Sequence, residues 1–528
     1  MNNSKATKRA LLTSVMALVM CVVMLVGTTF AWFTDTARTS VNKIQAGNLD
    51  VMLEMKNPNY TVGGTEKEWI SAEGETLQFK KAGGTNQELL WEPGCTYELP
   101  ALRISNNGNL KLKYKVAVTG INANRGGAKL NEVIDWTISN DGTPIAGTNE
   151  YALDAKNGAV VDSDILTIKG HMDEMANNDY QGLSIDGIGI TVYATQAIGE
   201  YDSTRNNYDE NATYPTGATI VGLNGTYDSL TAAAKAWRES KDILTTGGNM
   251  GGHPTELTSV DTISWVISGS VGTGDGTGVV GGGGVLLSGG YIYPSIAINN
   301  VYIKGVNNAE LKNEIGSDYA LSSGGKNVVY DGITFPEYVS FNSKAENVTF
   351  KNCTFKGGLK VMQAANVTVD NCKFEGDGTK DYAFFAQNST MESVVFTKNE
   401  VSNFQRGINV QDFSKTANVT ISGNTIKDII GKTENGATYG SAIQLTNAKT
   451  FTVTDNTISN VAVNALHIYN GCAADSIVIS DNAITAAYLC WNEANYTNVT
   501  SSGNTLNIAN VGKCVTKTTE IDSDFALN

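Results

Sequence analysis

Apolar and polar positions alternate within a segment of nine residues that recurs through the second half of the chain. Successive copies begin 19 to 32 residues apart, a period that suits one coil of a stacked structure. A second short apolar stretch lies between copies, as at 407–410 and 465–468. Short strands joined by turns rich in Gly and Asn predict a parallel β-helix over about 260–528. The clearest copies are NVTFKNCTF (347–355), NVTVDNCKF (366–374), SVVFTKNEV (393–401), NVTISGNTI (418–426), TFTVTDNTI (450–458), SIVISDNAI (476–484) and NVTSSGNTL (498–506).

Equivalent positions of the repeat should stack, because paired strands lie about 4.8 Å apart. Two apolar positions then form inward columns, and the position between them forms a polar ladder whose amides bond to the coils above and below. At its first two places, Cys353 and Cys372, the geometry allows a disulfide, and a reduced pair standing in for Asn is our preferred interpretation. The apolar columns are Phe350, Val369, Phe396, Ile421, Val453, Ile479 and Phe355, Phe374, Val401, Ile426, Ile458, Ile484, Leu506; the polar ladder is Cys353, Cys372, Asn399, Asn424, Asn456, Asn482, Asn504.

One helix is predicted, at 227–240. Asp228 or Ser229 can cap it, and Leu230, Ala233, Ala234 and Trp237 fall on one face. Such a helix directly before a repeat predicts an end cap that covers the apolar core of the first coil. The β-helix domain is therefore expected at 226–528, after a polar linker at 199–225.

The first half of the chain carries short apolar or alternating runs separated by Gly and Asn turns. About seven short strands with turns between them predict a β-sandwich over 32–198. The fold class is thus all-β throughout. The runs are 49–55, 99–104, 110–118, 133–138, 165–168 and 188–195.

The first 31 residues have the order of a secretory signal. Basic residues come first, the apolar run 10–26 follows, and small residues precede a cleavage site between Ala31 and Trp32. The alternative is an uncleaved membrane anchor, because an apolar run of about 17 residues or more can span a bilayer. We expect a secreted protein.

Charge and residue usage exclude several classes of function. The net charge of -15 argues against nucleic acid as a partner. No CxxC pair occurs among the seven cysteines, and the three histidines form no HExxH motif, so neither a metal site nor a cofactor is expected. Calcium binding has no support from a recurring Asp cluster.

Four separated motifs of the first half match a known family. They are AWFTD (31–35), QAGNLDV (45–51), WEPG (91–94) with ISNNGNL (104–110), and a closing block from 171 to 196. In order and spacing these motifs resemble TasA and camelysin, biofilm-matrix proteins of Gram-positive bacteria. The resemblance implies a jelly-roll-like sandwich and cleavage by a signal peptidase of the SipW type.

The same resemblance implies assembly into fibres or matrix, in which the freed N-terminal segment adds as a strand to a neighbouring subunit. Such a strand supplies backbone hydrogen bonds to an exposed sheet edge. The donor would be 32–46, with Trp32, Phe33, Val41 and Ile44 as its apolar residues. The alternative is that this segment pairs within its own domain. Camelysin is linked to a metallopeptidase activity, which the histidine pattern here does not support.

The second half resembles the right-handed parallel β-helix family, which includes pectate lyases and surface adhesins. A lyase of that kind would need a Ca²⁺ site and an Arg base, for which Arg406 near Asp412 is a weak candidate. Paired Asp motifs of the hydrolase kind are missing. The expectation is therefore a cell-surface or matrix protein without enzymatic activity, whose sandwich assembles or tethers and whose β-helix presents a surface, with glycan as a candidate ligand. The alternative is an extracellular polysaccharide lyase or hydrolase that uses the β-helix face.

Overall fold

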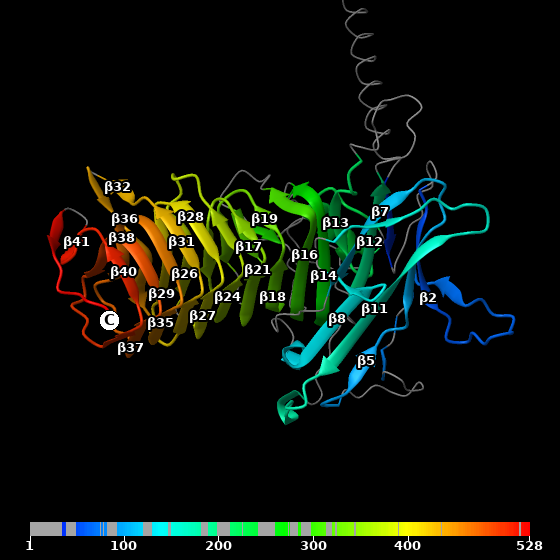
Figure 1. The fold of residues 1–528 in the computed structure, drawn as a ribbon, viewed down its shortest axis with the longest axis horizontal. Helices are drawn as coiled ribbons and strands as arrows, with labels where there is room; N and C mark the ends of the chain where they lie inside the picture. Colours follow the sequence, from blue (N-terminus) through cyan, green and yellow to red (C-terminus); the bar gives the residue numbers. More distant parts are fainter. Residues whose placement is uncertain are drawn as a thin grey trace, which may run out of the picture. The chain divides into compact units, whose positions relative to one another are not determined.

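The computed structural model describes residues 34–38, 49–81, 92–119, 129–145, 149–180, 188–197, 212–240, 259–274, 284–286, 297–312, 319–322, 325–342 and 345–528, apart from single positions or pairs at 74, 76, 78, 224, 273, 389, 435 and 517–518. The chain forms two compact units (Figure 1). One comprises Met1–Val118, Asp135–Met175 and Ile190–Pro215; the other comprises Thr119–Ile134, Ala176–Gly189 and Thr216–Asn528. In the described part no helix has the length and apolar character needed to cross a membrane.

The first unit is built from two antiparallel sheets. One has the order β1-β12-β7-β10, and the other has the order β3-β2-β6-β11-β5-β4, with β8 paired to β11 and β9 paired to β8. The strands are β1 (Thr34–Arg38), β2 (Val51–Lys56), β3 (Trp69–Ser71), β4 (Lys80–Lys81), β5 (Thr96–Glu98), β6 (Leu102–Asn106), β7 (Leu112–Thr119), β8 (Ile134–Asn140), β9 (Thr143–Pro144), β10 (Tyr151–Leu153), β11 (Asp162–Met172) and β12 (Gly189–Gln196). Short 3-10 helices at Lys129–Val133 and Asn178–Tyr180 lie in the two early stretches of the chain that belong to the second unit.

Alternating burial explains why these segments form strands. Leu112, Tyr114 and Val116 of β7 are buried while the residues between them are partly exposed, as a strand with one face on a core requires. Each of the six predicted runs corresponds to an observed strand. The all-β prediction for this half is confirmed.

The N-terminal segment pairs inside its own chain. β1 lies antiparallel to β12, with Thr34 opposite Thr195 and Arg38 opposite Thr191. This is the intramolecular alternative to strand donation. The cleavage site at Ala31 and Trp32 and the apolar donor candidates Trp32, Phe33, Val41 and Ile44 lie outside the described residues.

The second unit is a long stack of parallel strands, which confirms the predicted β-helix (Figure 1). Typical coils contribute three strands each, and every strand pairs with its equivalent in the next coil, as β18 does with β21 and β21 with β24. The strands of the stack are β14 (Ser259–Gly272), β15 (Gly284–Leu286), β16 (Ala297–Lys312), β17 (Tyr319–Ser322), β18 (Gly325–Asp331), β19 (Thr334–Phe335), β20 (Val339–Asn342), β21 (Asn347–Lys351), β22 (Thr354–Phe355), β23 (Leu359–Met362), β24 (Asn366–Asp370), β25 (Lys373–Glu375), β26 (Tyr382–Asn388), β27 (Ser393–Thr397), β28 (Glu400–Phe404), β29 (Arg406–Asp412), β30 (Asn418–Ser422), β31 (Thr425–Ile429), β34 (Ser441–Asn447), β35 (Thr450–Thr454), β36 (Thr457–Ile468), β37 (Ser476–Ser480), β38 (Ala483–Asn492), β39 (Val499–Ser502) and β40 (Thr505–Ile508).

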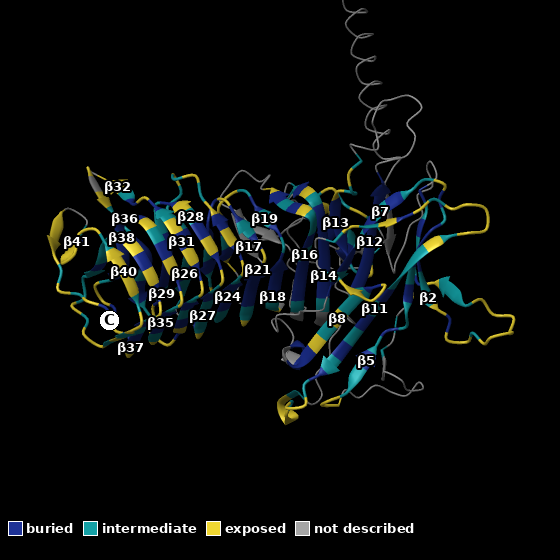
Figure 2. Cartoon of the chain, viewed as in Figure 1, coloured by how far each residue is buried: buried dark blue, intermediate teal, exposed yellow. Residues whose placement is uncertain are grey.

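Both predicted apolar columns exist and face the core of the stack (Figure 2). Phe350 pairs with Val369, and Phe355 pairs with Phe374, in parallel register. The Phe355 and Phe374 rings are stacked with centroids 4.9 Å apart. Leu506 is the exception at 37% exposure, because it belongs to the last coil.

The polar ladder lies inside the stack and repeats one bonding pattern. Asn399 accepts a hydrogen bond from the backbone of Cys372, donates to the carbonyl of Val369, and donates to the side chain of Asn424 at 3.1 Å. The next rungs repeat these bonds through Asn504. Cys353 and Cys372 are free thiols in the structure. Each thiol donates to the same kind of carbonyl that the amides use, which explains how Cys replaces Asn there.

The helix α2 (Leu230–Ser240) closes one end of the apolar core. It begins three residues later than predicted, because Ser229 is its N-cap and accepts a hydrogen bond from the backbone of Ala232 at 3.2 Å. The predicted apolar face is buried and belongs to the β-helix core. The strand β13 (Gly217–Ile220) lies within the predicted linker and pairs with β14, so the β-helix unit starts before residue 226.

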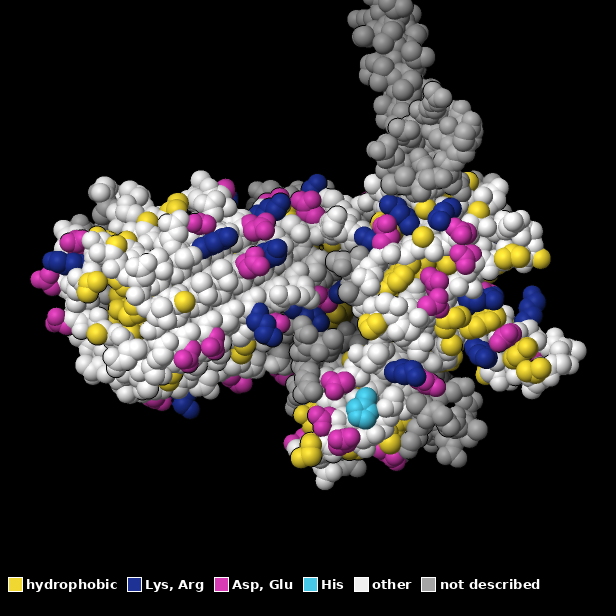
Figure 3. All heavy atoms as spheres, viewed as in Figure 1, with side chains coloured by type: hydrophobic (Ala, Val, Ile, Leu, Met, Phe, Trp, Pro, Cys, Tyr) yellow, Lys and Arg dark blue, Asp and Glu magenta, His cyan; other side chains and the backbone are white. Residues whose placement is uncertain are grey.

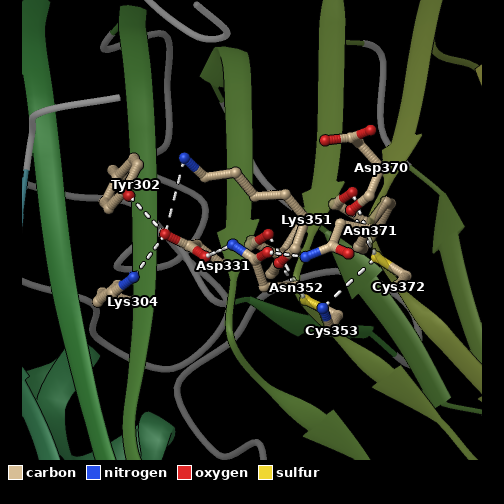
Figure 4. Close-up of polar contacts among 11 residues, drawn as sticks. Tyr302, Lys304, Asp331, Lys351, Asn352, Cys353, Asp370, Asn371 and Cys372 are labelled. Carbon is tan, nitrogen blue, oxygen red and sulfur yellow. Dashed lines mark hydrogen bonds and ion pairs between the residues drawn. The ribbon is translucent and has the colours of Figure 1, made fainter. Parts of the chain in front are cut away.

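A buried charge cluster lies on the first coils (Figure 4). Lys304, Asp331 and Lys351 stand in register on adjacent strands. Asp331 accepts hydrogen bonds from Lys304 Nζ at 2.7 Å and from Asn352 Nδ2 at 2.8 Å, and Lys351 Nζ lies 3.7 Å away. The side chains of Asp331 and Lys351 are each 4% exposed, so the pair must be satisfied internally.

We expect the stability contribution of Asp331 to vanish in acid. Burial by itself raises the pKa of this carboxyl, but Lys304 and Lys351 outweigh burial and the pKa ends below its ordinary value of 3.8. A lowered folded-state pKa stabilises the fold above the unfolded pKa, and this stabilisation is lost as pH falls through the folded pKa. Chemical denaturation of the wild type and Asp331→Asn should therefore differ most near pH 5 and converge toward about pH 2. A difference that is independent of pH would contradict the assignment.

Candidate functional site

One row of side chains runs across the coils on the outer side of the β-helix. Phe385 pairs with Asn409, Asn409 with Gln444, Gln444 with His467, and His467 with Trp491, one residue per strand in β26, β29, β34, β36 and β38. The residue before each of them on its strand is buried in the core. Because neighbouring side chains on a strand point to opposite faces, this row turns away from the core. We call these five residues the cleft row.

The cleft row lies along a cleft of about 270 Å³. Its remaining walls come from the same strands and from a hairpin between β31 and β34. The other lining residues are Tyr382, Arg406, Gln411, Tyr439, Gly440, Thr446 and Tyr469. All of them belong to the β-helix unit.

Aromatic rings stand at both ends of the row. At one end the His467 and Trp491 rings are stacked, with centroids 4.3 Å apart and an interplanar angle of 6°. At the other end Tyr382 and Phe385 are stacked at 5.3 Å. His467 Nε2 lies 3.0 Å from Glu493 Oε2, and this bond fixes the orientation of the imidazole ring.

Amides and hydroxyls occupy the middle of the row. Thr446 Oγ1 donates to Asn409 Oδ1 at 2.7 Å and accepts from Gln444 Nε2 at 3.1 Å. Tyr382 completes the network, because its hydroxyl accepts from Asn409 at 3.4 Å and donates to Gln444 at 3.3 Å. The polar groups are thus positioned by one another before any ligand binds, which lowers the entropic cost of binding.

An ion-pair group forms the wall beside Tyr382. Arg406 donates through Nε and Nη2 to the two carboxylate oxygens of Asp381, and its guanidinium lies 3.9 Å from the centroid of the Tyr382 ring. Lys432 Nζ lies 3.3 Å from Asp381 and 2.6 Å from Glu434. Burial lowers the pKa of Arg406, but the hydrogen bond with Asp381 and the nearby charges outweigh burial and raise it. Asp381 thus stabilises the protonated form of Arg406.

The hairpin of β32 (Lys432–Glu434) and β33 (Ala437–Tyr439) brings further polar groups to this wall. Tyr439 donates to Glu434 at 2.5 Å. Gly440, which follows the hairpin, has φ of 139° and a Cβ added there would lie 2.9 Å from Cγ of Arg406. Glycine is therefore needed where the chain leaves the hairpin beside Arg406.

The two residues proposed from sequence as an enzyme pair are not brought together. Arg406 lines the cleft and bonds to Asp381. Asp412 is fully buried at the other end of β29, where it accepts hydrogen bonds from the backbone of Ser414 and Ala417 at 2.9 and 2.8 Å. Asp412 thus holds a turn. The polar ladder lies inside the stack and is closed to a ligand.

Sequence reasoning located the strands of the cleft but missed its outward residues. The sequence did contain a pattern that locates these residues, because each missed side chain directly follows an inward apolar residue in the second strand of its coil. The row contains no repeated residue type, so a search for repeats passes over it. In the described residues no group of three or more His, Cys, Asp or Glu gathers as a metal site would require. His171, which precedes Asp173 and Glu174 in the sequence, bonds to Thr96 at 2.9 Å.

A comparison with protein-family models matches residues 283–439 to the right-handed β-helix region. The match covers the strands from β15 to β33 and two of the five residues of the cleft row, Phe385 and Asn409, and it agrees with the parallel stack described above. The TasA-like interpretation of the first half receives no support from it. No curated protein sequence matches the chain.

The comparison with solved structures matches the chain to catalytic domains, among them those of GH87 α-1,3-glucanases. A catalytic domain of a GH87 α-1,3-glucanase in complex with tetrasaccharides matches at 12% identity and a TM-score of 0.28, over 81% of this chain and 98% of the other. The Agl-KA catalytic domain matches at 11% identity and a TM-score of 0.20, over 79% and 90%. This finding corrects the expectation that the chain is not an enzyme. At such low TM-scores no residue of those enzymes is matched to a residue here, so the chemistry must be argued from the cleft itself.

Proposed function

We propose that the chain is a polysaccharide-active protein that binds a glycan in the cleft of its β-helix. The observation that carries the proposal is the cleft row, in which amide groups lie between two stacked aromatic pairs. The apolar C–H faces of a sugar ring pack on aromatic rings, while sugar hydroxyls exchange hydrogen bonds with amides. Five adjacent strands each supply one outward residue. Such a row suits an extended ligand such as a polysaccharide chain.

The activity we propose is hydrolysis of the bound glycan. In this reaction the oxygen of water bonds to the anomeric carbon and gives up a proton to a base, while the glycosidic C–O bond breaks and an acid donates a proton to the departing oxygen. Carboxyl groups perform both proton transfers. Asp381, Glu434 and Glu493 are the carboxylates bonded to residues that line the cleft or its wall. Glu493 is our first candidate, because its side chain is 24% exposed and its bonding partner is the buried His467.

We also propose that the protein is exported. The signal at 1–31 would deliver the protein to the cell surface or matrix of a Gram-positive-type bacterium after cleavage by a SipW-type peptidase. The TasA-like motifs support a sandwich that tethers or assembles there, where it would hold the β-helix beside extracellular polysaccharide. In the free subunit β1 pairs with β12 of its own chain. In an assembly the same strand could pair with a neighbouring subunit instead.

Incubation of the secreted protein with a panel of polysaccharides tests the proposal. We expect new reducing ends from at least one substrate, and a loss of at least about 100-fold in kcat for Glu493→Gln, the scale expected when a general acid or base is removed. Glu520→Gln is the matched control, because Glu520 is likewise hydrogen-bonded to an aromatic side chain, that of Tyr488, but lies in the C-terminal hairpin of β41 (Lys513–Val515) and β42 (Glu520–Asp522). Mass spectrometry of the same material should find Trp32 at the N-terminus. Absence of any binding or cleavage would refute the function.

A further inference from the structure

We infer that the cleft selects an uncharged glycan over a uronate polymer, and that Asp381 is the residue that sets this preference. The inference rests on the proposed function, whose ligand class it narrows. The inference is drawn from the charges around the cleft. It depends above all on the two cations of the cleft wall, Arg406 and Lys432, which are both bonded to Asp381.

Each cation of the wall has an internal anionic partner. Arg406 is held by both oxygens of Asp381, and Lys432 is shared between Asp381 and Glu434. The side chain of Arg406 is 15% exposed, so a competing anion has restricted access to it. Planar guanidinium and carboxylate groups bonded in this bidentate way form a strong pair.

The formal charges around the cleft leave no surplus of positive charge. Arg406 and Lys432 supply two positive charges, and Asp381, Glu434 and Glu493 supply three negative charges. Lys360, whose Nζ lies 5.3 Å from the centroid of the Phe385 ring, brings the sum to zero. On the face of the molecule that Figure 3 shows, acidic and basic side chains are likewise interspersed.

A uronate polymer carries one carboxylate on every sugar, and both cations of the wall, Arg406 and Lys432, are already bonded to carboxylates of the protein. To pair with Arg406 it would have to displace Asp381, which would keep only Lys432 as a partner beside the anionic ligand. A neutral glycan needs neither change, because hydroxyls bond to the amides of Asn409 and Gln444 and ring faces pack on Trp491 and Phe385. A polysaccharide lyase cleaves by elimination, which requires a uronate substrate. The charge balance of the cleft therefore also favours hydrolysis over lyase activity.

The test compares the affinities of soluble dextran and polygalacturonate for the full secreted protein, measured by calorimetry at low ionic strength. We expect the wild type to bind dextran at least tenfold more tightly. In Asp381→Asn, which leaves Arg406 and Lys432 without this partner, the ratio of polygalacturonate to dextran affinity should rise at least tenfold, and added salt should cancel the gain. Asp522→Asn is the matched control, since it also removes the carboxylate of an ion pair, with Lys513 at the C-terminal hairpin.

Each outcome bears on one of the two proposals. Preference of the wild type for polygalacturonate would overturn the inference and leave the polysaccharide function standing. Failure to bind either polymer or any other glycan of the panel would overturn the function and the inference together. If Asp381→Asn does not fold, Glu434→Gln releases Lys432 from its other partner, and an unchanged affinity ratio in that variant would count against the inference.

Discussion

Alanine at position 491 is expected to weaken glycan binding by roughly thirty-fold. Trp491 stacks on His467 at 4.3 Å and forms one aromatic end of the cleft row. Truncation of a central aromatic anchor typically raises the free energy of binding by about 2 kcal/mol or more, and each 1.4 kcal/mol is a factor of ten. The stacked imidazole would also lose its neighbour, while Glu493 would still hold it through Nε2.

Calorimetric titration of Trp491→Ala with the best substrate of the panel measures this effect. Tyr496→Phe is a suitable control, because Tyr496 lies after the same strand but bonds to the backbone of Ala474 rather than lining the cleft. Thermal unfolding should show that Trp491→Ala remains folded, since Trp491 is only partly buried on the outer side. Binding within twofold of the wild type would place the glycan elsewhere.

Substitution of Asn424 by alanine is expected to destabilise the β-helix by about 3 to 5 kcal/mol. Asn424 Oδ1 accepts from the backbone of Asn399, and Asn424 Nδ2 donates to the carbonyl of Phe396 and to Asn456. Alanine would leave buried donors and acceptors without partners on both neighbouring coils, and each such group costs about 1 to 3 kcal/mol.

Cysteine at the same position should restore part of this loss. The chain itself uses Cys353 and Cys372 in the ladder, where each thiol donates to the carbonyl that an amide would otherwise bond. Denaturant titration should therefore rank Asn424→Cys between the wild type and Asn424→Ala. Asn504→Ala should have the smallest effect, because Asn504 is only partly buried on the last complete rung. Equal losses of unfolding free energy in Asn424→Ala and Asn504→Ala would show that the contribution of a ladder residue to stability does not depend on its burial.

The ladder and the apolar columns were predictable because each coil repeats the same local pattern. A nine-residue segment with inward residues at fixed places has one register that buries all of them, and a shift by one residue would expose every column. The register found between Phe350 and Val369, and between Phe355 and Phe374, is the one that the repeat predicts. The capping helix was predictable for a similar reason, since its apolar face follows from spacing alone.

The cleft was not predictable in the same way. Its row joins Phe385, Asn409, Gln444, His467 and Trp491, which share no residue type and are separated by loops of unequal length. The partner of Arg406 is Asp381, 25 residues earlier, rather than the nearby Asp412. Proximity in sequence misleads here because Asp412 points into a turn.

The pattern of residues is enough to predict an all-β chain with a stacked β-helix, its inward columns, its interior ladder and its cap. These features follow from the alternation of apolar and polar residues, which is a local property repeated in every coil. The folded chain was needed to show which outward side chains meet and which carboxylate neutralises which cation. Outward residues are under no common packing constraint, so their pattern carries little signal until the stacking of the coils places them side by side.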